Sequence, residues 1–118
     1  MLLNIFQNAI KFTARGGQIT VVVELVDSDE IRISVIDNGI GIKQEDQNKV
    51  FMLFSSIKDE KSKINMKGLG LGLVISKMIV AEFEGSIDLI SKYEKGTCFY
   101  FTFKLDQIER EERLVRCV

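Results

Sequence analysis

The sequence contains no histidine, no proline and no tryptophan, and it has only two cysteines among 118 residues. Without histidine, this polypeptide has no imidazole base, no histidine metal ligand and no histidine phosphoacceptor. Cys98 and Cys117 lack the close spacing of a zinc or redox motif, so we expect a reducing, intracellular setting. Apolar runs are far shorter than a bilayer span, and we expect neither a transmembrane segment nor a secretory leader.

The sequence also has no excess of either sign of charge, because 16 basic and 17 acidic residues leave a net charge of −1. No overall field therefore favours nucleic acid or an anionic membrane, and a bound anion must be held by a local site. The length and the hydrophobic fraction of 46% predict one domain with a single core over residues 1–105. Residues 106–118 are mostly charged and are expected to form a tail that docks through Ile108, Leu114 and Val115.

The first half of the chain predicts a helix followed by a hairpin. Apolar residues at intervals of three and four indicate an amphipathic helix over residues 2–13. Apolar residues at every second position from Ile19 to Leu25 predict a strand over 18–26, and a second strand begins at Ile31 after a turn. That strand runs into residues 37–42, where two glycines interrupt regular pairing.

The second half predicts a short helix over 45–54, a polar loop or lid over 55–67, and a helix from Gly68 to about Phe83. Gly85 stops that helix, and strands at 86–91 and 97–105 form a second hairpin through residues 93–96. The order helix, hairpin, helix, lid, helix, hairpin predicts helices packed on one face of a largely antiparallel sheet.

The glycine-rich run that opens the second long helix is the first candidate binding element. Gly68, Gly70 and Gly72 would let backbone N–H groups approach an anion at a helix N-terminus. The spacing G-x-G-x-G differs from the dinucleotide fingerprint, and no phosphate-binding loop with a G-K-[ST] ending occurs. Glycines used for tight helix packing explain this run equally well.

A second element combines a carboxylate with two glycines. Asp37, at the end of a strand, could accept a hydrogen bond from an amino group such as that of adenine. Gly39 and Gly41 would then let a flat ring lie against the backbone. An aspartate that caps a turn is the commoner explanation for this residue.

A third element is a polar stripe along the first helix, formed by Asn4, Asn8 and Lys11. Amide oxygens can bind Mg²⁺, and Lys11 could contact a phosphate one turn further on. An ordinary solvated helix face is the commoner explanation. Each element alone is a weak signal, and their joint order in the chain carries more information.

That order resembles the catalytic, ATP-binding domain of sensor histidine kinases. The matching segments, in family order, are residues 3–13 (N box), 37–42 (first glycine box), 50–54 (phenylalanine box), 68–73 (second glycine box), and Lys95-Gly96-Thr97 with Phe99 (late glycine-threonine motif). The resemblance implies a Bergerat-type α+β fold, a two-layer α/β sandwich with helices on one face of a mostly antiparallel mixed sheet. It also implies ATP and Mg²⁺ as cofactors.

Carried over by position, the resemblance implies specific roles. Asn8 would bind Mg²⁺, and Asn4 and Lys11 would lie near the phosphates as catalytic residues. Asp37 would bind the adenine amino group, with Gly39 and Gly41 shaping its pocket. The further implied cofactor contacts are Phe54, Lys67, Gly68, Leu69, Gly70, Leu71, Gly72 and Thr97. Gly68, Gly70 and Gly72 would cradle phosphates, Thr97 would lie near adenine, and Phe51 with Phe54 would anchor a lid over 55–67.

The residue at position 4 separates branches of the superfamily. ATP-hydrolysing relatives typically have glutamate there to activate water, whereas Asn4 is an amide and cannot act as a base. We therefore expect transfer of the γ-phosphoryl group of ATP to a histidine on a separate domain or chain, in two-component signalling. The expected partners are a histidine-bearing dimerisation domain and a response regulator, without nucleic acid, in the cytoplasm. The alternative is a nucleotide-binding regulatory module without catalysis.

The sequence departs from the family pattern in three ways. It begins inside the N-box helix, so we expect the domain to be incomplete at its N-terminus and its sheet to lack an edge. The phosphoacceptor helix pair does not occur in this sequence. Leu69 replaces a threonine of the second glycine box, while Lys67 and Glu84 stand where glycines are frequent.

Overall fold

Three helices and four strands are seen in the computed structural model, which describes residues 1–52 and 71–105. In chain order they are α1 (Leu2–Phe12), β1 (Ile19–Asp27), β2 (Glu30–Asp37), α2 (Gln44–Gln47), α3 (Leu71–Glu82), β3 (Ile87–Lys92) and β4 (Gly96–Lys104). The predicted lid over 55–67 and the predicted tail over 106–118 lie outside the described residues. None of the described helices is long and apolar enough to cross a bilayer.

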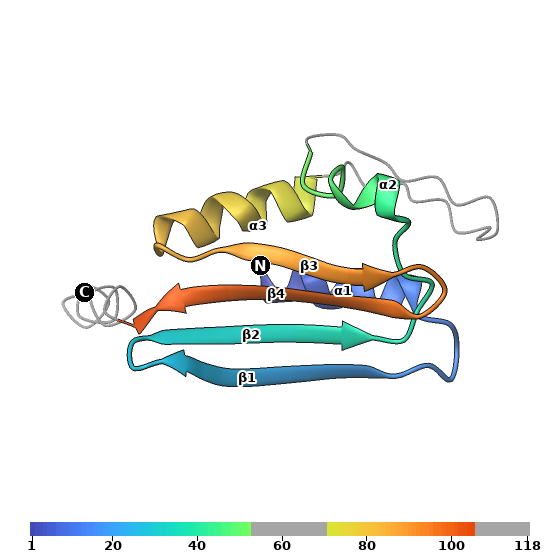
Figure 1. Cartoon of the computed structure of the whole chain (residues 1–118), viewed down its shortest axis with the longest axis horizontal. Coiled ribbons are helices and arrows are strands. Elements are labelled where there is room, and N and C mark those ends of the chain that lie inside the picture. Colours follow the sequence, from blue (N-terminus) through green and yellow to red (C-terminus); the bar gives the residue numbers. More distant parts are fainter. Residues whose placement is uncertain (53–70, 106–118) are drawn as a thin grey trace.

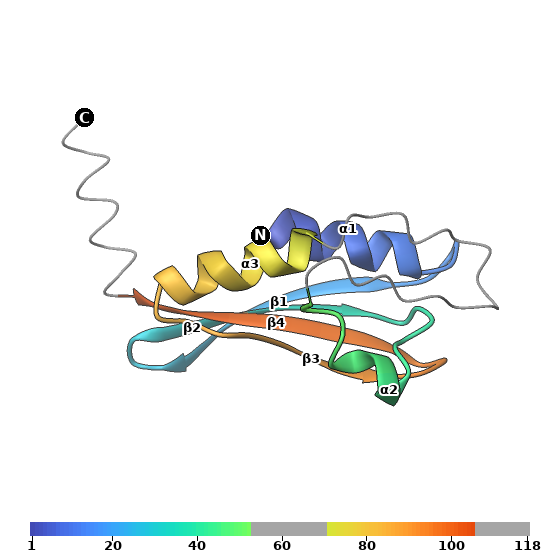
Figure 2. The same ribbon diagram turned by 90° about the horizontal axis from the view of Figure 1, so that it is seen from above.

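The four strands form one antiparallel sheet in the order β1-β2-β4-β3. Two hairpins, β1–β2 and β3–β4, therefore lie side by side and meet where β2 pairs with β4 (Figure 1). The helices α1 and α3 pack on the same face of this sheet (Figure 2), so the molecule has two layers. The predicted α+β class and the predicted placement of helices on one face are confirmed.

The core lies between the two layers. Side chains of a strand alternate between faces, so every second residue of β2 and β4 points toward the helices. The buried core consists of Ile5 and Ala9 of α1, Val80 of α3, Val35 of β2, and Phe99 and Phe101 of β4. Phe51 meets Phe99 edge-to-face, with ring centroids 6.3 Å apart. This packing fixes α1 and α3 over the central strands.

The helix predicted over residues 45–54 is shorter in the structure. α2 ends at Gln47, and the chain continues in turns in which the Lys49 backbone N–H donates to Asp46 and that of Met52 donates to Lys49. The side chain of Val50 is only 8% exposed. These tighter turns let Val50 and the neighbouring Phe51 reach the core, which apolar spacing alone does not reveal.

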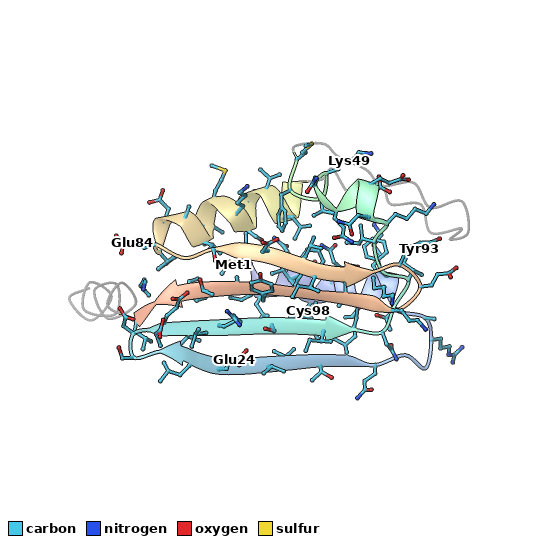
Figure 3. All side chains as sticks on the ribbon, viewed as in Figure 1. Met1, Glu24, Lys49, Glu84, Tyr93 and Cys98 are labelled. Atoms are coloured by element: carbon cyan, nitrogen blue, oxygen red, sulfur yellow. The ribbon has the colours of Figure 1, made fainter. Side chains whose placement is uncertain are left out.

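The C-terminus of α3 ends in a left-handed residue that is not glycine. Glu84, labelled at the end of α3 in Figure 3, has a φ of +53°. The backbone N–H of the following Gly85 then donates to the carbonyl oxygen of Val80 over 3.0 Å, which is a common way to close a helix. The sequence correctly places the stop at Gly85, but the residue in the left-handed conformation is Glu84.

Candidate nucleotide-binding site

A row of polar side chains crosses the helix-facing side of the sheet at one end. Asp37 of β2 pairs with Thr97 of β4, and Thr97 pairs with Ser91 of β3. These residues share their face with Val35 and Phe99, two positions away along β2 and β4. Asp37 and Thr97 are 8% and 7% exposed. Polar groups are rarely buried in a core without a purpose, so this row is the natural starting point for a site.

The carboxyl group of Asp37 is held by two backbone N–H donors. Gly39 donates to its Oδ1 over 2.9 Å and Thr97 donates to the same atom over 3.3 Å. Burial raises the pKa of Asp37 above its ordinary value, because the desolvation of the charged form outweighs these two donors, which lower it. Among the described residues both hydrogen bonds end on Oδ1. The second carboxylate oxygen can therefore accept a proton donor of a ligand.

The loop after β2 is fixed between α1 and the β3–β4 turn. The backbone N–H of Ile40 donates to the carbonyl of Phe12 over 3.1 Å, and Glu94 donates to the carbonyl of Ile40 over 2.6 Å. Gly41 has a φ of +67°, and a Cβ there would lie 2.1 Å from the carbonyl oxygen of Lys92. This glycine is thus required by the close approach of two backbone segments. Its predicted role in shaping an adenine pocket remains a prediction, as does that of Gly39.

The polar stripe of α1 faces the beginning of α3. The side-chain amide of Asn4 donates through Nδ2 to the carbonyl oxygen of Gly72 over 3.3 Å. The hydroxyl of Ser76, which is fully buried, donates to the same oxygen over 2.8 Å. Asn8 and Lys11 follow Asn4 on the same side of the helix, at one and two turns. The structure therefore brings Asn4 and Gly72 together, and their places near the phosphates remain predictions.

The carboxylate and the stripe belong to one region of the molecule. The C-terminal end of α1 contacts the loop that follows Asp37, and its N-terminal end contacts Gly72 of α3. The helix rise between Asn4 and Phe12 is about 12 Å. A ligand that spans this length would meet an acceptor at one end and amides with a lysine along its course. An adenine nucleotide, with an amino group at one end and phosphates at the other, fits this arrangement.

A magnesium ion would find few protein ligands here. In residues 1–52 and 71–105, no group of three or more His, Cys, Asp or Glu side chains could hold a metal ion. Asn8 is partly exposed, and its side chain forms no hydrogen bond with the described residues, so its amide oxygen is free for a hard cation. Mg²⁺ commonly takes one or two protein oxygens and completes its shell with phosphates and water. The residues present fit an ion that arrives with a nucleotide.

The predicted contacts of the second glycine box fall partly within the described residues. Leu71 is the first residue of α3, and Gly72 follows it. The remaining predicted contacts of the lid and the second glycine box lie outside the described residues: Phe54, Lys67, Gly68, Leu69 and Gly70. Phe51 packs against Phe99, and its role in anchoring a lid remains a prediction.

Two polar residues near the row were not predicted. Ser91 accepts a hydrogen bond from the backbone of Ile42 over 2.8 Å. Gln47 of α2 donates through Nε2 to the carbonyl oxygens of Ile42 and Ser91, over 3.0 and 3.1 Å. The signal for Ser91 exists in the sequence, because it continues the inward-facing series of Ile87 and Leu89 with a hydroxyl. Gln47 gives no such signal, since its role depends on where α2 lies.

The fold and the family match place the chain in a class of ATPase domains. Residues 1–107 match the family described as histidine kinase-, DNA gyrase B- and HSP90-like ATPase. The chain belongs to this family. The match covers every described element, from α1 to β4.

Within the family, the similarity is to sensor kinases. The chain is 33% identical over 112 residues to the adaptive-response sensory kinase SasA of Prochlorococcus marinus (strain MIT 9303), covering 95% of this chain and 30% of SasA. The catalytic domain of the histidine kinase ThkA superimposes with a TM-score of 0.71 at 32% identity, covering 87% of this chain and 63% of that one. Full-length ShkA in complex with AMPPNP gives a TM-score of 0.71 at 28% identity, covering 86% and 20%. This chain thus spans less than a third of SasA.

Proposed function

We propose that this chain binds ATP·Mg²⁺ and donates the γ-phosphoryl group to a histidine on a separate domain or chain. It would act as the catalytic domain of a protein-histidine kinase. The observation that carries the proposal is the buried Asp37 carboxylate at one end of a polar stripe on α1. Membership of the ATPase family and the similarity to histidine kinase catalytic domains support it.

Each residue of the site would have a distinct task. Asp37 would accept a hydrogen bond from the adenine amino group, and the loop at Gly39 and Gly41 would lie against the ring. Asn8 would bind Mg²⁺ through its amide oxygen, and Lys11 would neutralise phosphate charge. Mg²⁺ would supply further charge neutralisation when bound. Such positioning and neutralisation provide most of the rate in phosphoryl transfer.

Asn4 would favour transfer over hydrolysis. Its amide has no basic group to deprotonate water, and its Nδ2 atom already holds the Gly72 carbonyl. In the proposed reaction, a nitrogen lone pair of an external imidazole attacks the γ-phosphorus. The bond from phosphorus to the bridging oxygen breaks, and its electron pair leaves with ADP. The acceptor must be external, because the chain has no histidine.

The proposed partners are a histidine-bearing dimerisation domain and a downstream response regulator, in the cytoplasm. A second candidate function is a nucleotide-binding regulatory module without transfer. The absence of a histidine from this sequence is compatible with both functions. Incubating the chain with a separate histidine-bearing domain and ATP labelled at the γ-position distinguishes them, because only the kinase gives an acid-labile labelled product.

Nucleotide binding is tested by titrating the chain with a fluorescent adenine nucleotide, with and without Mg²⁺. Asp37→Ala removes a charged acceptor and should weaken binding roughly 10- to 100-fold. Asn8→Ala should weaken binding in Mg²⁺ far more than binding without it. Glu24→Gln, on the outer face of β1, is the control for loss of a carboxylate. Wild-type affinity in Asp37→Ala would contradict the proposed adenine contact.

A further inference from the structure

The hydroxyl group of Ser91 has its whole hydrogen-bonding capacity in use. Its Oγ accepts from the backbone N–H of Ile42 over 2.8 Å and donates to the carbonyl oxygen of Gly96 over 3.0 Å. A third contact joins it to Oγ1 of Thr97 over 2.8 Å. A serine hydroxyl carries one proton and accepts two hydrogen bonds. A carbonyl only accepts, so the Ser91 proton points to Gly96, and Thr97 must donate to Ser91.

The backbone of Ser91 is fixed as well. Gln47 donates through Nε2 to the carbonyl oxygen of Ser91 over 3.1 Å and to that of Ile42 over 3.0 Å. The hydroxyl is therefore held between the loop after β2 and the β3–β4 hairpin from both sides. The direction of its hydrogen bonds is a built-in property of the fold.

This arrangement leaves the Thr97 hydroxyl unable to donate a hydrogen bond to a ligand. Its only hydroxyl proton is committed to Ser91, so Oγ1 can act toward a ligand only as an acceptor. The neighbouring group in the row, the carboxylate of Asp37, is also an acceptor in its ionised form. Two adjacent acceptors favour a ligand with N–H donors and disfavour a ligand that presents a carbonyl oxygen there.

We propose that Ser91 is a positioning residue that determines the preference for adenine over guanine nucleotides. Adenine has an amino group on the ring carbon where guanine has a carbonyl oxygen. By holding the proton of Thr97, Ser91 keeps the end of the site rich in acceptors, which suits the amino group and repels the carbonyl. The inference rests on the proposed nucleotide binding, and it adds a residue that does not touch the nucleotide.

The chain offers a matched control at the other end of the same two strands. There Ser86 meets Thr102, with the two hydroxyl oxygens 3.3 Å apart and the backbone N–H of Ser86 donating to Thr102 Oγ1 over 3.1 Å. Ser86→Ala thus removes a similar serine–threonine contact remote from Asp37. It reports what loss of such a pair does to stability alone.

The experiment measures dissociation constants for ATP and GTP by competition against a fluorescent adenine nucleotide, at pH 8 and constant Mg²⁺. The wild type should prefer ATP. In Ser91→Ala, the Thr97 hydroxyl can rotate and donate to a carbonyl, so the preference for ATP over GTP should fall about tenfold. Ser91→Thr retains the hydroxyl and should restore the preference. Ser86→Ala should leave it unchanged.

A purely structural Ser91 would give a different result. Ser91→Ala would then weaken ATP and GTP binding by the same factor, and this equal loss would overturn the inference while leaving the proposed function intact. Ser91→Cys retains the size with only weak hydrogen bonds and covers the case in which the alanine variant does not fold. An unchanged preference in the cysteine variant would likewise overturn it. Failure of the wild type to bind ATP would refute the proposed function itself.

Discussion

Two strands of equal length, β1 and β4, differ in how far their apolar side chains are buried. β1 and β4 each have nine residues, and both have a run of apolar side chains at every second position on the helix-facing side. On the helix-facing side, Phe101 of β4 is 1% exposed, whereas Val23 and Leu25 of β1 are 64% and 63% exposed. β4 pairs with strands on both sides, while β1 is at the edge of the described sheet. The helices contact chiefly the other three strands, and neither α1 nor α3 overlaps β1 in the face-on view of Figure 1.

The comparison shows that coverage by helices, rather than strand pattern, decides where a site can form. Asp37 and Thr97 lose water because they lie on β2 and β4, beneath the helical layer. Burial of this kind strengthens the hydrogen bonds of a polar group and makes its partner specific. A carboxylate in the middle of β1 would remain solvated, and it could not discriminate between ligands in the same way.

The largest expected effect is on the free energy of unfolding, and it comes from comparing a valine beneath the helices with a valine that no helix covers. Val35 of β2 is 1% exposed, and Val23 of β1, on the same face, is 64% exposed. Val35→Ala should lower the free energy of unfolding by about 2–3 kcal/mol, through lost burial and the cavity left behind. Val23→Ala should change it by less than about 1 kcal/mol. Urea denaturation measures both values, and equal losses would show that β1 is also covered in solution.

The next effect concerns two left-handed glycines. Gly16 has a φ of +83°, and a Cβ added there would meet nothing within 4 Å, whereas a Cβ at Gly41 would lie 2.1 Å from the Lys92 carbonyl oxygen. Gly16→Ala meets only the backbone strain, about 1–2 kcal/mol. Gly41→Ala should cost at least about 1 kcal/mol more, because the loop must also move away from the β3–β4 turn. Denaturation of the two variants side by side gives the difference, and equal costs would mean that the turn yields without strain.

Much of this fold could be predicted from the sequence because local signals agree with it. The intervals in residues 2–13 and the alternation in 18–26 depend on periodicity, which the chain carries in itself. Which strands become central depends on contacts between distant segments. β1 and β4 both have a run of apolar residues at every second position, so the sequence pattern could not predict that Val23 is exposed.

In the candidate site, too, local features could be predicted from the sequence, whereas long-range contacts could not. Asp37 follows from its place between a strand and two glycines, and the structure places it in a buried polar row. Asn4 also contacts Gly72 across the two helices, a contact that no local pattern in the sequence predicts. The link from Gln47 to Ser91 joins residues 44 positions apart, and no local pattern contains that information.

The buried carboxylate should also give the protein a distinctive pH dependence. Burial raises the pKa of Asp37 in the folded state above its ordinary value of 3.8. The folded protein therefore holds this proton more tightly than the unfolded chain does. Relative to Asp37→Asn, the wild type should be most stable below pH 3.8 and lose stability as the pH rises through the raised pKa. Above that pKa the difference should be constant.

Urea denaturation of both proteins over an acidic pH series measures this difference, with Glu24→Gln as the control for the loss of one charge. The sign follows from desolvation as the larger cause. A wild type that gains stability over Asp37→Asn with rising pH would mean that the two N–H donors outweigh burial. The pKa of Asp37 in the folded state would then lie below its ordinary value.

The smallest effect has the opposite sign and concerns how α3 is brought to the sheet. Glu84 has a φ of +53°, a left-handed conformation in which a glutamate is strained and a glycine is not. Glu84→Gly should raise the free energy of unfolding by about 0.5–1 kcal/mol. The same substitution two residues earlier, Glu82→Gly, lies in the last turn of α3 and should lower it by a similar amount, about 0.5–1 kcal/mol.

If Glu84→Gly raises the free energy of unfolding and Glu82→Gly lowers it, the gain at position 84 is due to relief of backbone strain. A general effect of glycine or of a lost charge would give both variants the same sign. Equal destabilisation by both variants would show that the Glu84 side chain stabilises the turn by more than its backbone strain costs. In either case, the junction that covers β3 with a helix is set by a single residue in the left-handed region. β1 has no such junction within the described residues, and its apolar face remains open.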